Sequence, residues 1–337
     1  MSLTISRSRL QALLQAGAGR RVTVLGDAML DVYLRGDVDR ISPEAPVPVV
    51  RVRERKYALG GAANVAQNVA ALGAHCRLIG TVGTDAGADT LRRLLESVAP
   101  GADRLVRVGR PTTTKTRIVA RAQQLVRVDE EEDADLTAGE LERVLQAVQA
   151  SLADSDALVL EDYNKGVLVP RVIEQSIEWA RARGMPIVVD PKFRNFFLYR
   201  GATIFKPNRR ELDAALGAGI DLDHPDALPE TFARLGVEHL LLTLGERGMA
   251  LLSPDGTIAR IPTVAREVYD VVGAGDTVTA YLAVMLARGA SVSEASVIAN
   301  YAAGVEVGKL GAATVTPDEV LASYDEVAEQ QARPPRG

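Results

Sequence analysis

Cysteine is almost missing from this chain of 337 residues, which has Cys76 alone. A single cysteine excludes an intramolecular disulfide framework and a thiolate-rich zinc site, and it is typical of a reducing compartment, so we expect a cytoplasmic protein. Histidine is also scarce. The three histidines are scattered among strand starts and a loop, and we interpret them as structural or solvent-facing side chains rather than metal ligands: His75, His224 and His239.

Two further absences narrow the choice of partner. No run of about 18 apolar residues occurs, and the N-terminal segment is not apolar enough for a signal peptide, so we expect no membrane function. The net charge is -5, from 39 basic and 44 acidic residues, which gives no reason to expect the extended basic face of a nucleic-acid binder. A small molecule is the expected partner.

Short β-branched runs alternate with helical-period segments along most of the chain. The run at 21–27 is the first, and helical segments at 138–153 and 170–184 separate later ones. This alternation predicts an α/β fold with a mainly parallel sheet that helices cover on both faces. Ligands of such sheets collect at the carboxyl ends of strands. The polar residues at or just after these ends are Asp27, Asp31, Asp162, Asp190 and Asn208.

Two segments, 45–59 and 114–132, alternate apolar and charged residues instead. This pattern predicts strands with one wet face, and we interpret them as a small accessory sheet that closes a site as a lid. The alternative is a pair of edge strands of the main sheet; prolines at 46 and 48 confine the first segment to an edge or irregular strand either way. We expect one domain over residues 1–330, with lid strands from about 32–59 and 105–130, and a disordered tail at 331–337.

The segment VVGAGDTVTA, residues 271–280, places three small residues before Asp276 and an apolar helical stretch. If this segment opens a helix, its unpaired N–H groups and the helix dipole form an anion site beside a carboxylate. Asp276 can then take a proton from an attacking hydroxyl, while the N–H groups of Gly273, Ala274 and Gly275 stabilise a phosphoryl group in transit. The alternative is an ordinary helix start that Asp276 merely caps.

A second small-residue segment, 59–74, puts Gly60 and Gly61 before Asn64 and an Ala/Val-rich helix. Such a helix start can present Asn64 and backbone donors to a ligand hydroxyl, although tight packing explains it equally well. Two competing motifs fail. Residues 304–310, GVEVGKL, have the wrong spacing for a P-loop, and no G-x-G-x-x-G follows the first strand, so a nicotinamide enzyme loses its main support.

The motifs GDAMLD, GG with a following Asn, PNRRE, TLGERG and GAGD occur in this order over almost the whole chain, from the first strand onward. Together they resemble the ribokinase (PfkB) family of sugar kinases. The resemblance implies a ribokinase-like three-layer α/β/α domain with a small β-sheet lid. Within the family, RISPEAPVPVV, QQLVRVD, DYNKG and VGKLGAATV most resemble bacterial kinases of D-glycero-β-D-manno-heptose 7-phosphate. Many bacteria fuse that kinase to a nucleotidyltransferase domain, for which this chain is too short, so we expect a stand-alone kinase.

The resemblance also implies roles for individual positions. Asp276 is the base that activates the anomeric hydroxyl, and Asn208 and Glu211 hold Mg²⁺, usually through water. The segment 300–311 lies where the family closes over adenine and a monovalent cation, which makes K⁺ a further candidate. Sugar contacts are expected at Asp31, Gly60, Gly61, Asn64 and Asp162. ATP contacts are expected at Lys192, Asn208, Thr243, Gly245, Gly248, Asn300, Gly304 and Gly311.

A substrate that already carries a phosphate needs a second anion site, remote from Asp276. The candidates in or beside the lid are Arg40, Lys115 and Arg117. Lys165 and Lys192, at strand ends, can contact either phosphate. The alternative for each of these five residues is a solvated surface charge with no ligand.

Two positions depart from the family pattern: Val272 stands where many members have Thr, and Lys206 stands where Asn or Thr is commoner. We expect both to tune ATP contacts.

The expected function is ATP- and Mg²⁺-dependent phosphorylation of heptose 7-phosphate at C1, for ADP-heptose and lipopolysaccharide-core synthesis. One alternative is another kinase of the family, acting on ribose, adenosine or a hexose phosphate. Alternatives outside the class are a non-catalytic nucleotide-sugar sensor, against which the intact Asp276 argues, and a Rossmann dehydrogenase. Because lids of this family often pair between subunits, we expect a homodimer joined through 45–59 and 114–132.

Overall fold

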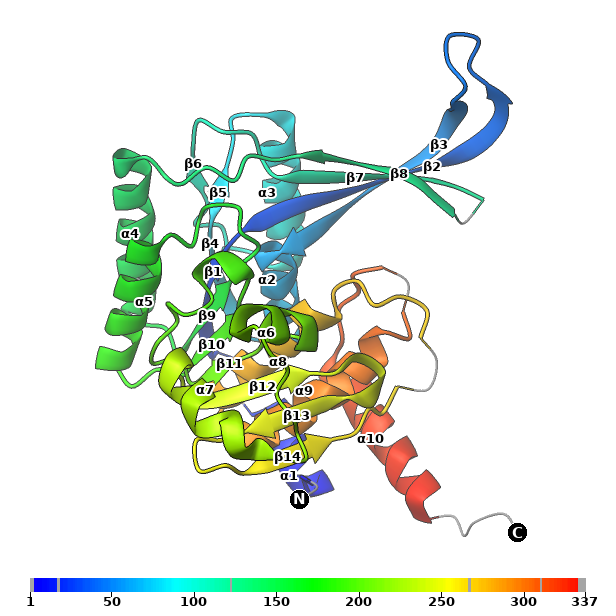
Figure 1. Ribbon diagram of the computed structural model, residues 1–337. Coiled ribbons are helices and arrows are strands. Elements are labelled where there is room, and N and C mark those ends of the chain that lie inside the picture. The colour runs from blue at the N-terminus through cyan, green and yellow to red at the C-terminus, as the bar shows by residue number, and fades with distance from the viewer. Residues whose placement is uncertain (1–2, 17–18, 122, 266–267, 310, 333–337) are drawn as a thin grey trace.

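The computed structural model describes residues 3–16, 19–121, 123–265, 268–309 and 311–332. Its centre is an eight-stranded sheet in the order β14-β13-β12-β11-β10-β9-β1-β4 (Figure 1). The six strands from β12 to β4 are parallel, which confirms the mainly parallel sheet predicted from the β-branched runs. These strands are β1 (Arg21–Gly26), β4 (His75–Ile79), β9 (Ala157–Glu161), β10 (Ile187–Asp190), β11 (Ile204–Phe205) and β12 (His239–Thr243).

An antiparallel hairpin extends the sheet beyond β12. It consists of β13 (Met249–Leu252) and β14 (Ile258–Ile261), and β13 pairs with β12. A short 3-10 helix, η3 (Gly245–Arg247), joins β12 to β13, so no crossover helix separates these two strands. The alternation of strand and helix therefore ends at β12, and the sequence pattern did not predict this hairpin.

Helices cover both faces of the sheet, as predicted. Alternate side chains of a strand point to opposite faces, so Val22 and Val24 of β1 belong to one apolar core, and Leu158 and Leu160 of β9 belong to the other. The first core is covered by α1 (Arg7–Gln15), α2 (Ala62–Ala71), α3 (Ala86–Val98), α8 (Ala274–Ala287), α9 (Val292–Glu306) and α10 (Pro317–Ala332). The second is covered by α4 (Ala138–Leu152), α5 (Pro170–Ala182), α6 (Arg209–Leu216) and α7 (Leu228–Leu235), with the short helices η1 (Phe193–Asn195) and η2 (Pro225–Ala227) nearby in the chain.

A separate four-stranded sheet, for which we keep the name lid, projects from the central body (Figure 1). Its order is β3-β2-β7-β8, with β2 (Ala28–Ile41), β3 (Pro48–Gly61), β7 (Thr114–Ala120) and β8 (Gln123–Glu130). Because these strands pair with one another in a sheet of their own, the predicted accessory sheet is confirmed and the edge-strand alternative is wrong. That this sheet closes a site stays a prediction. The residues 105–113 contribute β6 (Val106–Arg107), which pairs with β5 (Thr81–Val82), so the second lid segment begins at Thr114.

The C-terminal end differs in part from the expected tail. Gln331 and Ala332 belong to α10, so the disorder predicted for 331–337 is wrong for these two residues, and 333–337 lie outside the described residues. Among the helices of the described ranges, none combines the length and the apolar character that a membrane crossing requires.

Candidate active site

Asp276 lies in the first turn of α8, directly after the glycine-rich turn. Gly273 is the N-cap residue, with a left-handed backbone (φ 96°), and a β-carbon there would lie 3.0 Å from Asn64 Nδ2 and 3.2 Å from Ala312. The amide of Thr277 donates the first regular bond of the helix, to the carbonyl of Gly273 at 2.9 Å. The amides that precede Thr277 have no acceptor within the helix, and that of Ala274 makes only a long contact of 3.5 Å with the carbonyl of Val271. The helix end is therefore open, as an anion site requires.

The carboxylate of Asp276 is buried, with 5% of the residue exposed, and two side chains hold it. Asn64 Nδ2 donates to one oxygen at 2.6 Å, and the Tyr163 hydroxyl donates to the other at 2.8 Å. The alternative in which Asp276 merely caps its helix is wrong, because the N-cap is Gly273 and the carboxylate is bound by other elements. Burial raises the pKa of Asp276 to about 6, against the effect of its two hydrogen bonds. A carboxylate with such a pKa is well placed to act as a general base near neutral pH.

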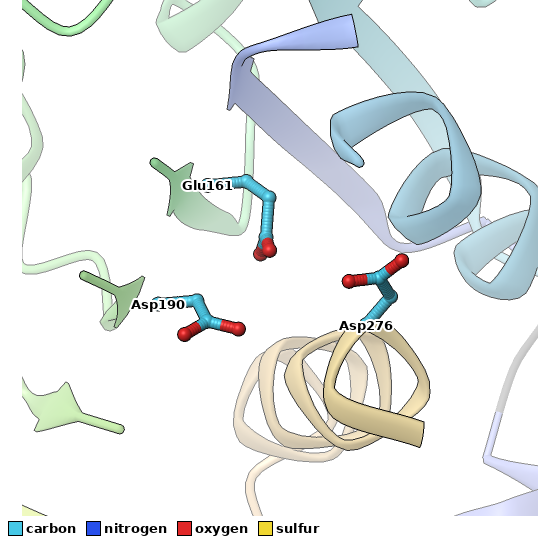
Figure 2. A group of neighbouring side chains, drawn as sticks. All are labelled: Glu161, Asp190 and Asp276. Atoms are coloured by element: carbon cyan, nitrogen blue, oxygen red, sulfur yellow. The ribbon is translucent and has the colours of Figure 1, made fainter. Parts of the chain in front are cut away.

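Three carboxylates from separate elements point toward one another at this point (Figure 2). Glu161 ends β9, Asp190 ends β10, and Asp276 begins α8; one oxygen of each lies within 4.8 Å of the others. Both carboxylate oxygens of Glu161 are buried without a hydrogen-bond partner among the described residues. Burial, with the nearby charges of Asp190 and Asp276, raises the pKa of Glu161 well above its usual value.

Two lysines lie beside these carboxylates. Lys206, which is buried, donates to Asp190 at 2.7 Å. Burial alone lowers the pKa of Lys206, but Asp190 and Glu161 outweigh burial and raise it, so its ammonium group stays charged. Lys192 forms an ion pair with Glu211 and lies 5.2 Å from the centre of the Tyr163 ring. The family departure at Lys206 thus adds a positive charge to a strongly acidic cluster.

A cavity of about 1000 Å³ lies beside Asp276 and has the size of a nucleotide site. Its walls come from strand ends on one side and from α8 and α9 on the other. Most positions expected to contact ATP or the metal line it, together with the glycine turn: Lys192, Asn208, Glu211, Thr243, Gly245, Gly248, Gly273, Ala274, Gly275, Asn300 and Gly304. Gly311 is not among the lining residues, and its amide donates to Asp270 at 3.2 Å.

The PNRRE motif forms the start of α6. Asn208 is the N-cap, its side chain accepts from the amide of Glu211 at 2.9 Å, and Glu211 accepts from the amide of Asn208 at 2.8 Å. This reciprocal capping box holds both side chains at the cavity wall. Thr243 pairs with Asn208 in an isolated bridge, and Asn300 donates to the carbonyl of Pro262 at 2.9 Å. The ATP side of the cavity is thus built largely from helix and strand ends.

The residues expected to contact the sugar lie where the lid joins the central sheet. Asp31, on β2, accepts from Arg117 of β7. A β-carbon at Gly60 would lie 2.5 Å from an oxygen of Asp31, so any other residue there would displace the Asp31 carboxylate. Gly61 is the N-cap of α2, whose first turn carries Asn64, and Asn64 reaches Asp276. The predicted sugar contacts therefore approach the predicted base from the lid side.

Asp162, which we expected to contact the sugar, instead binds residues of its own surroundings. Its carboxylate accepts from the Tyr199 hydroxyl and from the amide of Asn164, both at 2.7 Å. Asp27 binds the same loop, and accepts from the amides of Tyr163 and Lys165 at 2.8 and 3.0 Å. These two acids fix the loop that presents Tyr163 to Asp276. Sequence reasoning missed Tyr163; the only signal for it was its position in DYNKG, directly after a strand end.

The basic residues predicted to bind a second phosphate differ in the acidic partner that each one faces. Lys115 and Lys165 both face Glu131, at 3.7 and 2.7 Å, whereas Arg117 binds Asp31. Arg40 is exposed and pairs with Val49 near the outer end of the lid, beyond a register shift, so the structure does not bring it together with the others.

Comparison with known proteins decides the family. The profile described as pfkB family carbohydrate kinase matches residues 20–319. The chain belongs to the pfkB family of carbohydrate kinases. This membership confirms the resemblance read from the motifs and excludes the dehydrogenase alternative.

The relatives of this chain include proteins named bifunctional protein HldE. The protein from Rhodospirillum rubrum is 44% identical over 306 residues, which is 90% of this chain and 62% of that protein. The protein from Caulobacter vibrioides is 46% identical over 314 residues, which is 91% of this chain and 64% of that protein. The chain thus spans less than two thirds of the length of these relatives.

Solved structures of pfkB-family kinases share the fold. Arabidopsis thaliana ribokinase, solved with ribose and ATP, has a TM-score of 0.70 at 22% identity, over 91% of this chain and 99% of that one. Escherichia coli phosphofructokinase-2, solved with potassium, has a TM-score of 0.74 at 20% identity, over 92% and 99%. These likenesses confirm the ribokinase-like α/β fold.

Proposed function

We propose that this pfkB-family kinase transfers the terminal phosphoryl group of ATP to the anomeric C1 hydroxyl of D-glycero-β-D-manno-heptose 7-phosphate. The products are the 1,7-bisphosphate and ADP, and the product feeds ADP-heptose and lipopolysaccharide-core synthesis. The observation that carries phosphoryl transfer is the buried Asp276 at an open helix N-terminus beside a cavity of nucleotide size. The heptose substrate is supported by the motif resemblance and by the relatives named HldE.

In the proposed reaction, Asp276 takes the proton of the C1 hydroxyl as the oxygen attacks the γ-phosphorus of ATP. The bond from O1 to phosphorus forms, the bond from phosphorus to the bridging oxygen breaks, and ADP leaves with that electron pair. The amides of Gly273, Ala274 and Gly275 lie at the helix end, where they stabilise charge on the transferred group. Asn64 and Tyr163 hold the carboxylate in one orientation before the reaction begins.

The cavity wall also fits a magnesium ion. Mg²⁺ prefers hard oxygen ligands and keeps several of its waters, and the wall offers a carboxylate and an amide oxygen at Glu211 and Asn208. We propose that these two residues hold Mg²⁺ through water, and that the ion, when bound, neutralises charge on the ATP phosphates. Potassium is proposed as a second cation, because phosphofructokinase-2 of E. coli was solved with it.

The deciding experiment is ADP release by the wild type and by Asp276→Ala with a panel of acceptors. The panel is heptose 7-phosphate, ribose, adenosine and fructose 6-phosphate, each with ATP and Mg²⁺. We expect selective turnover of the heptose phosphate, and a loss of about 10²-fold or more in the variant with ATP binding retained. Asp255→Ala, which alters an exposed carboxylate on a distant turn, is the control.

Each other outcome rejects a different part of the proposal. Preference for another acceptor keeps the base and discards the heptose substrate. ATP binding without turnover of any acceptor supports the sensor alternative. An active Asp276→Ala overturns the role of Asp276.

A further inference from the structure

Two lysines from different parts of the chain converge on one carboxylate at the base of the lid. Lys115 lies on β7, Lys165 lies in the loop after β9, and Glu131 directly follows β8. The ammonium group of Lys165 donates to Glu131 Oε1 at 2.7 Å, and that of Lys115 lies 3.7 Å from Oε2. The two lysine side chains are mostly buried, with 17% and 18% exposed.

Lys115 shares a face of the lid with the expected sugar contact. In the parallel pairing of β2 and β7, Asp31 lies opposite Lys115, and paired residues point to the same face of a sheet. Arg117, two residues further along β7, reaches Asp31 on that same face. Lys115 is therefore a neighbour of the position at which the proposed sugar is bound.

Lys165 approaches from the central sheet. Asp27 holds the amide of Lys165, and it also holds the amide of Tyr163, whose hydroxyl donates to Asp276. The loop that carries Tyr163, the hydrogen-bond partner of Asp276, thus also carries Lys165. Lys115 and Lys165 meet where the lid and the active-site loop approach each other.

The charges at this point are unbalanced. Asp129 and Asp31 lie opposite Lys115 on the neighbouring strands, but they pair with Arg127 and Arg117. The two ammonium groups therefore share the single charge of Glu131, whereas a phosphate group brings close to two negative charges and three strong acceptor oxygens. The segment 131–137, to which Glu131 belongs, is described and lies outside helices and strands, so no helix or strand holds Glu131 in place. A phosphate can therefore replace the Glu131 carboxylate without disrupting a helix or a strand.

We propose that Lys115 and Lys165 bind the phosphate that the sugar substrate already carries, and that Glu131 occupies this position in the free enzyme as an intramolecular competitor. The inference rests on the proposed function and names the residues that select a phosphorylated sugar. Binding exchanges one anion for another, and no covalent bond changes. An unphosphorylated sugar has no group that can displace Glu131, so the lysine pair also discriminates against such sugars.

The other basic candidates are engaged elsewhere. Arg117 binds Asp31, Lys192 pairs with Glu211 on the nucleotide side, and Arg40 lies near the outer end of the lid. Of the five candidates named from the sequence, Lys115 and Lys165 are the two that share one anion in the described structure.

The test compares Lys115→Met, Lys165→Met and Glu131→Gln by steady-state kinetics with heptose 7-phosphate and ATP. We expect each lysine variant to raise KM for the sugar phosphate about tenfold, with kcat and KM for ATP close to wild type. Glu131→Gln should lower KM for the sugar phosphate several-fold, because the competing charge is gone. Opposite signs separate this role from a structural one, since loss of a structural ion pair impairs the enzyme whichever partner is removed.

Two controls keep the test decisive. Lys56→Met removes the same charge from an exposed position on β3 and should leave all constants unchanged. Lys115→Arg and Lys165→Arg keep the charge and should restore a KM within about threefold of wild type, which answers the case in which a methionine variant does not fold.

The proposal fails if both lysine variants turn over heptose 7-phosphate with the wild-type KM, a result that leaves the proposed function intact. It also fails if Glu131→Gln raises KM for the sugar phosphate. Preference of the wild type for unphosphorylated sugars would instead reject the proposed substrate, and the phosphate site with it. Inhibition by inorganic phosphate, tested as an independent probe, should be stronger for Glu131→Gln than for the wild type.

Discussion

Asp276 must be ionised to accept a proton, and burial raises the pKa of this carboxyl group to about 6. A raised pKa means that the group keeps its proton to a higher pH than a solvated aspartate does. We therefore expect kcat/KM to fall about tenfold per pH unit below about pH 6 and to level off above about pH 7. A pH–rate profile from about pH 5 to 8 measures this.

The phosphate of the substrate titrates in the same range, so a variant must identify the group. The hydrogen bond from Asn64 lowers the pKa of Asp276, and Asn64→Ala removes it. The acid limb should then move to higher pH, whereas a limb due to the substrate would stay in place. A profile that is flat down to about pH 5 contradicts the assignment.

Glu161 leads to a prediction about stability. Burial and the nearby Asp190 and Asp276 raise its pKa well above the usual value, so the folded protein binds this proton more tightly than the unfolded chain does. Stability from this group is fully present below the unfolded pKa and is lost as pH rises through the folded pKa. Glutamine is neutral throughout, so Glu161→Gln should unfold at a higher temperature than wild type, with a difference that grows as pH rises.

Thermal unfolding at several pH values measures this difference. Glu178→Gln, at an exposed position on α5, is the control and should follow the wild type at every pH. A Glu161→Gln protein that is less stable than wild type at about pH 8 would show that the ionised carboxylate is favourable where it lies.

At the scale of elements, the sequence predicted those strands and helices that a local pattern of residues specifies. The parallel strands follow from β-branched runs, and the helix start at Asp276 follows from the spacing of GAGD. Tyr163 and Glu161 could not be assigned to the site, because their proximity to Asp276 exists only after three elements assemble; Tyr163 lies 113 residues from Asp276 in the chain. The hairpin of β13 and β14 was missed because its first strand, Met249–Leu252, has no β-branched residue.

Gly248 fixes the turn between β12 and β13, at the wall of the cavity. Its backbone is left-handed (φ 82°), and a β-carbon would lie 2.2 Å from the carbonyl oxygen of Ile261. We expect Gly248→Ala to lower the free energy of unfolding by more than about 1–3 kcal/mol, because a backbone clash adds to the conformational strain. We also expect a higher KM for ATP, because Gly248 lines the cavity.

Gly256 provides a matched control for this prediction. It also has a positive φ, 84°, but a β-carbon there would meet nothing within 4 Å. Gly256→Ala should therefore carry the backbone strain alone, destabilise less and leave KM for ATP unchanged. Denaturant unfolding of both variants gives the comparison, and equal losses would show that packing around Gly248 can relax.

At the scale of the whole molecule, the lid leaves part of an apolar face uncovered. Leu34 lies opposite Ile118, and Ile118 lies opposite Val126, so the pairing puts these three side chains on one face. Leu34 packs against the central core, so the uncovered part of this face lies toward β8. Val126 and Val128 are 48% and 47% exposed, and β3 and β8 are the two edges of the sheet. Exposed apolar strands at a free edge favour association with another chain.

We therefore predict a homodimer in which the lids of two subunits cover each other, with an isologous contact. The double variant Val126→Asp, Val128→Asp would bury two carboxylates against the same carboxylates of the other subunit, without a partner of opposite charge. Light scattering should therefore show a monomer at micromolar concentration, and the circular dichroism should match that of the wild type. Val98→Asp is the control, because Val98 is 45% exposed on α3, outside the lid, and should leave the dimer intact. A wild type that is already monomeric at that concentration would reject lid pairing, and a dimer that survives the double substitution would place the interface on another surface.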